Sequence, residues 1–203
     1  MNFQLSAATL IFIATIATSL VGLFGSPKLI DACLFRPYWF ARRRQKEFHT
    51  LVTSGFVHGD VMHLLFNMLT FYFFAFNLER YIGMVWFAIL YLGALLVSSL
   101  WTYVKHKREP DYATLGASGA VSAVLFAAIV FFPYQSIYIL PIPGTGIPAP
   151  LFGVLYLAYT YYSAKQSRGR INHDAHLGGA LTGLAFVALV APGQYSELFG
   201  SLF

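Results

Sequence analysis

The sequence has little cysteine and little charge. A single cysteine among 203 residues excludes an internal disulfide and says little about the compartment. Asp, Glu, Lys and Arg together make up only 10% of the chain, whereas soluble domains carry about 25%. With 58% hydrophobic residues and a mean hydropathy of +0.64, the chain is predicted to be an integral membrane protein. No internal repeat with a period of roughly 20–50 residues is visible.

The net charge of +5 does not indicate a nucleic-acid partner. The basic residues lie in short segments between apolar runs, where they determine membrane topology. The expected partner is therefore the lipid bilayer, and no nucleic acid is expected.

Apolar runs separated by charged or proline-rich stretches predict an all-α polytopic membrane protein with six spans. We expect one membrane domain over residues 1–203, with spans at about 7–24, 61–78, 81–104, 117–132, 151–163 and 173–191. No Lys or Arg precedes the first run, so it is interpreted as a transmembrane helix and not as a signal peptide. Five prolines mark a turn at 133–150. The long first loop, 25–57, interleaves basic and aromatic residues, which suits the headgroup region.

Polar side chains inside the apolar spans are the candidate functional residues. His63 and Asn67 are four residues apart, so they share one face of the second span, and His58 lies just before it. A buried histidine or asparagine in a membrane helix is energetically costly and therefore suggests function. The alternative for Asn67 is hydrogen bonding between helices.

The stretch LGASGAVSAVLF (115–126) places Ser118 between two glycines at the start of the fourth span. Gly116 permits a sharp turn into the helix, and Gly119 leaves no bulk beside the hydroxyl. A helix beginning here directs free N–H groups towards Ser118, as a nucleophilic serine and its oxyanion require. The alternative is that these small residues only let two membrane helices pack closely.

The sixth span carries His176, Gly179 and Gly183 on one face. Glycines four residues apart allow a neighbouring helix to approach closely, so His176 can reach the small-residue face of the fourth span. The second, fourth and sixth spans enter the membrane from the same side. Their polar residues are therefore predicted to meet at one depth, below one face of the bilayer.

Three stretches together resemble the rhomboid family of intramembrane serine proteases. They are HGDVMHLLFN (58–67), GASG (116–119) and AHLGGALTG (175–183), in the family's order and each on an even-numbered span. The resemblance covers residues from about 47 to 187. It implies a six-helix core with a water-filled cavity, and an enzyme that cleaves transmembrane substrates without a cofactor. The expected substrates have a small residue before the cleaved bond and helix-breaking residues after it.

The resemblance also implies roles for individual residues. Ser118 matches the family's nucleophile and His176 its general base. His63 and Asn67 match the positions that stabilise the oxyanion together with the Ser118 N–H, and His58 matches a further upstream histidine. The chemistry agrees, because neutral imidazole can accept the serine proton near pH 7 and N–H groups can donate to the oxyanion.

The chain departs from the family pattern at two places. Ser122 stands four residues after Ser118, where the family often has an aromatic residue that stacks on the histidine, and its hydroxyl is a candidate for orienting His176. His49 and Thr50 stand where the first loop of the family commonly has a Trp–Arg pair. Asp174 is not expected to complete a triad, because two residues before His176 it points to another side of the helix.

Three other functions are alternatives to the protease. A metal hydrolase would use histidines as ligands, namely His58, His63, His173 and His176. No HExxH motif or carboxylate pair accompanies them, so no metal is expected. A non-catalytic rhomboid-like protein that binds membrane clients would be expected to have lost Ser118 or His176, and both are present. A transporter is disfavoured because no pair of broken helices recurs in two halves.

The cell (inner) membrane is the expected location, and charge predicts the orientation. Twelve of the thirteen Lys and Arg residues lie in the segments before the second, fourth and sixth spans (25–57, 105–112 and 165–174). Excess positive charge marks the cytoplasmic side, which predicts that the site faces the cytoplasm. The family resemblance implies the opposite orientation. Part of the excess could instead belong to a first loop bound to anionic headgroups.

Overall fold

The computed structural model describes residues 6–42, 47–138, 144, 146–166 and 172–201, and most of them are helical. Among these residues, four helices are long and apolar enough to cross a membrane. They are α1 with its π-helical end (Ala7–Gly25), α6 (Val61–Ile82), α7 (Met84–His106) and α10 (His173–Val190). The helices α8 (Ser118–Phe131) and α9 (Ala149–Gln166) lie at the positions of the predicted fourth and fifth spans. The mainly helical membrane fold is confirmed, whereas the count of six spans is not.

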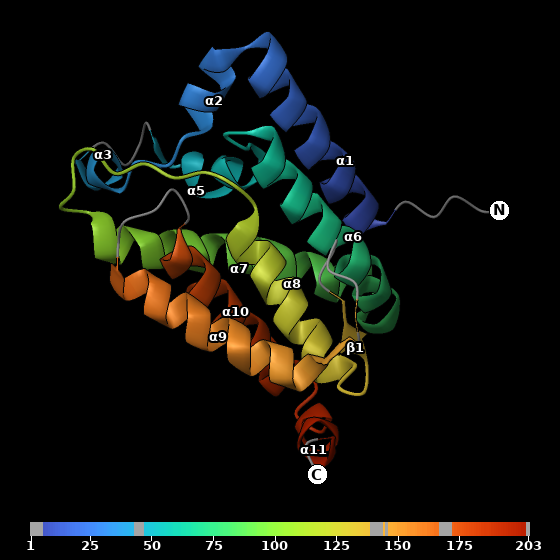
Figure 1. The fold of residues 1–203 in the computed structure, drawn as a ribbon. Coiled ribbons are helices and arrows are strands. Elements are labelled where there is room, and N and C mark those ends of the chain that lie inside the picture. Colours follow the sequence, from blue (N-terminus) through green and yellow to red (C-terminus); the bar gives the residue numbers. More distant parts are fainter. Residues whose placement is uncertain (1–5, 43–46, 139–143, 145, 167–171, 202–203) are drawn as a thin grey trace.

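The helix α8 is the centre of the bundle. It contacts α6, α7, α9 and α10, and Figure 1 shows it between them. Every residue from 119 to 131 is buried. A helix that is hydrophobic on all sides is expected in the interior of a protein or membrane, and here it is enclosed by other helices. Ser118, at its first turn, is thereby held inside the bundle.

Glycines on α10 allow very close packing against α8. An ideal Cβ on Gly179 would lie 1.9 Å from the carbonyl oxygen of Gly119, and one on Gly183 would lie 2.3 Å from that of Ala123. Real Cβ atoms do not approach this closely, so the two backbones touch only because both α10 positions are glycine. The predicted close approach of these two helices is confirmed.

The first loop is more ordered than the sequence suggested. It contains the short helices α2 (Pro27–Cys33), α3 (Pro37–Arg42) and α5 (Thr50–Thr53), followed by a 3₁₀ turn (Ser54–Phe56). Phe35 and Phe40 are buried against Leu51, and Tyr103 of α7 packs on this cluster. Two backbone hydrogen bonds, of 2.9 and 3.0 Å, join Phe35 to Thr114. These aromatic side chains therefore support the segment that leads into α8 and do not face lipid.

The second span is longer than the predicted range of 61–78 and includes Glu79. α6 continues to Ile82 and stops at Gly83, whose φ is +85°. Glu79 is buried and accepts hydrogen bonds from the Ser6 hydroxyl and from the Ala7 N–H at 2.7 Å. Its carboxylate thus caps the N-terminus of α1, where the helix dipole favours negative charge.

The predicted turn at 133–150 contains a small element that the sequence did not suggest. The strands β1 (Ser136–Ile137) and β2 (Ile147–Pro148) pair in antiparallel fashion. A further short helix, α11 (Gln194–Gly200), follows α10 and was not predicted either. Figure 1 shows α11 beside the C-terminus, at the end of the bundle away from α2 and α3.

Candidate active site

Ser118 is the first residue of α8, as the sequence predicts. The chain turns into the helix at Gly116, whose φ of +114° is rarely adopted by other residues. An ideal Cβ at this position would lie 2.5 Å from a ring carbon of His63, so glycine also admits that ring. The N–H groups of the first helical turn have no partner within the helix, so α8 directs donors, including the Ser118 N–H, to this end.

His63 and Asn67 lie in the first two turns of α6. Asp60 caps this helix, and its carboxylate accepts a hydrogen bond from the His63 N–H at 2.7 Å. The Asn67 amide donates one of its two N–H groups to the His63 carbonyl at 2.9 Å. Its second N–H is then available as a donor to a bound group.

His58 supports the site from behind. It is fully buried, and Ser19 of α1 lies 3.0 Å from its Nδ1. Burial and, to a smaller extent, the nearby His63 lower the pKa of His58 to about 3, against the opposing effect of Asp60. The neutral ring accepts a long hydrogen bond of 3.4 Å from the Ala117 N–H through Nε2. His58 therefore joins α1 to the start of α8.

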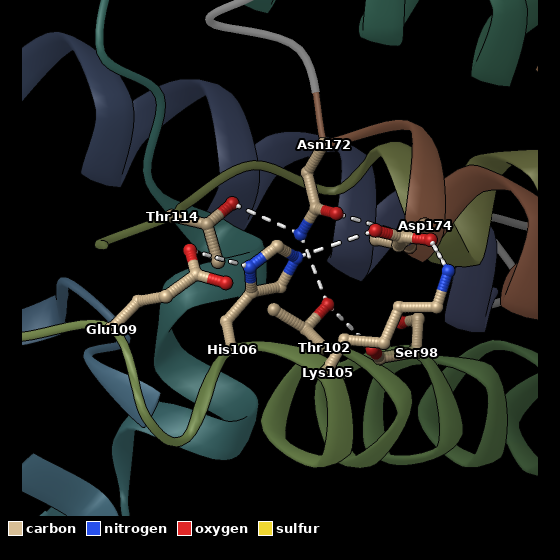
Figure 2. A network of polar contacts seen from close by, with 9 residues as sticks. Ser98, Thr102, Lys105, His106, Glu109, Thr114, Asn172 and Asp174 are labelled. Carbon is tan, nitrogen blue, oxygen red and sulfur yellow. Dashed lines mark hydrogen bonds and ion pairs between the residues drawn. The ribbon is translucent and has the colours of Figure 1, made fainter. Parts of the chain in front are cut away.

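The start of α10, which carries His176, is fixed by Asn172. The Asn172 side-chain oxygen accepts the Ala175 N–H at 3.0 Å and so caps the helix. Its amide donates to the hydroxyls of Thr102 at 3.0 Å and Thr114 at 3.3 Å. Figure 2 shows Asn172 between these two threonines. One side chain thus ties α10 both to α7 and to the segment that leads into α8.

Asp174 faces away from His176, as its spacing predicts. It forms ion pairs with Lys105 and His106 at the end of α7, the second at 3.3 Å. Figure 2 shows both partners converging on its carboxylate, with Glu109 on the other side of the His106 ring. Asp174 is therefore an anchor between α10 and α7 and is not the third member of a triad.

Tyr156 of α9 is the site residue that the sequence did not reveal. Its hydroxyl lies 3.2 Å from His176 Nδ1 and 2.9 Å from the Ser122 Oγ. Its ring is nearly parallel to that of His176, with an interplanar angle of 19° and a centroid separation of 6.4 Å. Tyr156 is one of four tyrosines in α9, and nothing in the sequence around it marks it as the one that reaches His176.

One cavity of about 610 Å³ brings the predicted residues together. Its polar lining residues on α6, α8, α9 and α10 include His63, Asn67, Ser118, Ser122, Tyr156 and His176. Much of the remaining wall is apolar and includes Phe66, Phe73, Leu125 and Phe152. The polar residues of three even-numbered predicted spans therefore meet as expected. Their chemical roles stay predictions.

Some predicted residues lie outside this cavity. His58 is placed behind it, and the four glycines 116, 119, 179 and 183 act through backbone approach. Ser118 and His176 both line the cavity, but among the hydrogen bonds of the described residues none joins their side chains. Such catalytic contacts are often long in the absence of substrate. Within the described ranges, no three His, Cys, Asp or Glu side chains gather closely enough to hold one metal ion.

Comparison with known proteins identifies the family. Residues 45–193 match the family model of the rhomboid domain. The chain belongs to the rhomboid family. This rhomboid is 31% identical over 163 residues to RHOMBOID-like protein 12, mitochondrial, of Arabidopsis thaliana, covering 72% of the chain and 48% of the relative. It is also 31% identical over 151 residues to Rhomboid protein 1, mitochondrial, of Saccharomyces cerevisiae, covering 70% of the chain and 43% of the relative.

The relatives support a membrane location but differ from the predicted compartment. This rhomboid is a multi-pass membrane protein, and it spans less than half of the length of the two relatives. Both are named as mitochondrial, which differs from the cell (inner) membrane predicted for this chain. A rhomboid protein of Bacillus subtilis is 38% identical over 86 residues, covering 42% of the chain and 41% of that protein.

Proposed function

We propose that this rhomboid is an intramembrane serine endopeptidase that cleaves transmembrane protein substrates. One observation carries the proposal. A serine at a helix start, a histidine, and two further polar side chains lie around one cavity that is otherwise largely apolar. An apolar cavity accepts a segment of a membrane-spanning peptide, and the polar group supplies what amide hydrolysis needs.

The first half of the reaction forms an acyl-enzyme. His176 accepts the hydroxyl proton of Ser118 as Oγ attacks the carbonyl carbon of the scissile amide. Negative charge develops on the carbonyl oxygen, and the Ser118 N–H, the free Asn67 N–H and the His63 ring donate to it. The C–N bond then breaks, His176 protonates the departing amine, and the acyl group remains on Ser118.

The second half of the reaction requires water. A water molecule attacks the ester carbon while His176 accepts its proton, and the proton returns to Oγ as the ester breaks. Ser118 also lines a small cavity of about 20 Å³, together with the polar residues Ser98, Thr102 and Asn172. That volume suffices for about one water molecule with polar partners. The cavity thus has room for a water molecule beside the proposed nucleophile.

Asn67 and His63 are expected to act in the transition state. Asn67→Ala or His63→Ala should lower kcat by about 10²-fold, the usual effect of losing one oxyanion donor, with little change in KM. Thr70→Ala is the matched control, because Thr70 lines the same cavity one turn beyond Asn67. Steady-state kinetics on a fluorogenic transmembrane peptide measure the effect. A rise in KM at unchanged kcat would place both residues in substrate binding, and loss of folded protein would favour a packing role.

For the orientation, we propose that the site faces the cytoplasm, as the distribution of Lys and Arg predicts. A reporter fused after Phe203 checks this, because this orientation puts both termini on the opposite side. Alkaline phosphatase should be active and green fluorescent protein dark. The reverse pattern would show that the charge distribution is misleading in this chain.

The proposed activity is tested with the wild-type chain in lipid vesicles. We expect it to cleave members of a panel of transmembrane peptides at one bond within the membrane-spanning segment, with products identified by mass spectrometry. Stable binding of these peptides without cleavage would instead indicate a client-binding protein.

A further inference from the structure

Tyr156 contacts His176 at Nδ1, which leaves Nε2 as the ring nitrogen that can accept the Ser118 proton in the proposed mechanism. Its hydroxyl lies between His176 Nδ1 and the Ser122 Oγ, at 3.2 and 2.9 Å. Ser122 is buried in α8, and Tyr156 packs on Phe126 of the same helix with ring centroids 5.5 Å apart. The phenol therefore has a fixed position between α8 and α10.

A tyrosine hydroxyl carries one proton, so it can donate to only one of its two neighbours. If Tyr156 donated to Nδ1, the proton of the neutral His176 ring would lie on Nε2, and Nε2 could not accept the proton of Ser118. If Tyr156 donates to Ser122, its lone pair faces His176 and accepts an N–H from Nδ1. Nε2 is then left as the basic nitrogen.

The longer of the two distances favours the second arrangement. The 2.9 Å contact between Tyr156 and Ser122 joins two hydroxyls and is compatible with either one as the donor. O–H donors form bonds of about 2.5–3.0 Å, so 3.2 Å is long for donation from the phenol to Nδ1. N–H donors extend to about 3.2 Å, which fits the contact between Nδ1 and the phenol oxygen. The hydrogen bonds then run in one direction, from His176 to Tyr156 to Ser122.

We propose that Tyr156, held by Ser122, is a positioning residue that accepts the Nδ1–H of His176 and keeps Nε2 free for Ser118. The proposal rests on the proposed protease function. It assigns to a neutral phenol the orienting role that an aspartate has in a Ser–His–Asp triad. It also explains how the chain dispenses with an aromatic residue at position 122: the aromatic ring beside His176 is supplied by α9, and the serine holds that ring.

The kinetic consequence is a selective loss of turnover. Tyr156→Phe keeps the ring but removes the acceptor, so kcat should fall by about threefold to tenfold, as expected for one neutral hydrogen bond, while KM stays nearly unchanged. Ser122→Ala should cause a smaller fall in the same parameter. Because the two act in series, Ser122→Ala should have no further effect in the Tyr156→Phe background. Tyr162→Phe, at an exposed position of α9, is the matched control and should retain full turnover.

The deciding experiment reads the tautomer of His176 directly. The full chain is labelled with ¹⁵N-histidine in detergent micelles, and the His176 signals are assigned by their loss in His176→Gln. We expect Nδ1 protonated and Nε2 unprotonated in the wild type and in Tyr162→Phe, and a mixed population in Tyr156→Phe and Ser122→Ala.

Two results would overturn the proposal. One is a wild-type ring that carries its proton on Nε2. The other is a Tyr156→Phe variant with the wild-type tautomer and kcat. The spectra do not depend on catalysis, so a protein that cleaves nothing but shows the expected tautomers would contradict the protease function and leave the positioning role standing. If Tyr156→Phe fails to fold, Ser122→Ala gives the same readout.

Discussion

Ser118→Ala and His176→Ala are each expected to abolish cleavage if the proposed mechanism holds, with a fall in kcat of roughly three orders of magnitude or more, the effect known for serine hydrolases. In the proposed mechanism the first variant removes the atom that attacks the amide, and the second removes the base without which the hydroxyl is unreactive. Because the two side chains act as a unit, the double variant should be no slower than either single variant. Rates are measured on a transmembrane peptide in lipid vesicles.

His173→Ala is the matched control for His176. The two rings lie on the same turn of α10, 5.9 Å apart, but His173 does not line the cavity. The control should keep most of its activity, with or without a chelator present. A collapse of activity in His173→Ala that matches the effect of the chelator would point to a metal centre and contradict the serine mechanism.

Gly179→Ala is expected to have the largest effect on stability. The added Cβ would lie 1.9 Å from the Gly119 carbonyl oxygen, which is backbone and cannot rotate away, so α10 and α8 must separate. Overpacking of this kind typically costs about 1–3 kcal/mol and sometimes more. Since Gly119 follows Ser118 directly, cleavage should be lost as well.

A matched glycine series tests this interpretation. Gly183→Ala, with a contact of 2.3 Å, should also destabilise the protein, whereas Gly93→Ala on α7 meets nothing within 4 Å. The Gly93 variant should be neutral or slightly stabilising, because alanine favours helix by up to about 1 kcal/mol over glycine. Unfolding of each variant is followed in mixed micelles by intrinsic fluorescence. Equal stability of Gly179→Ala and Gly93→Ala would show that α8 and α10 are not packed as described.

The sequence predicted the parts of the site that stand out against an apolar background. Ser118, His63 and His176 are polar residues in runs that are otherwise hydrophobic, and few placements in a membrane bundle satisfy all three. Glycine spacing predicted the contact between α8 and α10, because a stripe of glycines on a helix face has one main structural use in a membrane. The direction of the even-numbered spans then placed Ser118, His63 and His176 at the same depth.

Other features depend on contacts between distant residues and have no local signal. Tyr156 resembles the other tyrosines of α9, and only the folded chain brings it to Ser122, 34 residues away in sequence. The predicted second span stopped at residue 78, before the charge of Glu79, but that carboxylate lies within α6 and caps a helix more than 70 residues away. The first loop shows basic and aromatic residues typical of a membrane surface, although Phe35 is buried within the protein.

Labelling with a fluorophosphonate tests the central claim most directly. This reagent phosphonylates a serine hydroxyl only when a base activates it, and it requires no knowledge of the substrate. After digestion, mass spectrometry should locate one adduct on Ser118 in the wild type, strongly reduced labelling in His176→Ala, and none in Ser118→Ala. Equal labelling of Ser118→Ala, or an adduct on another serine such as Ser98 or Ser122, would contradict the assignment of Ser118 as the nucleophile.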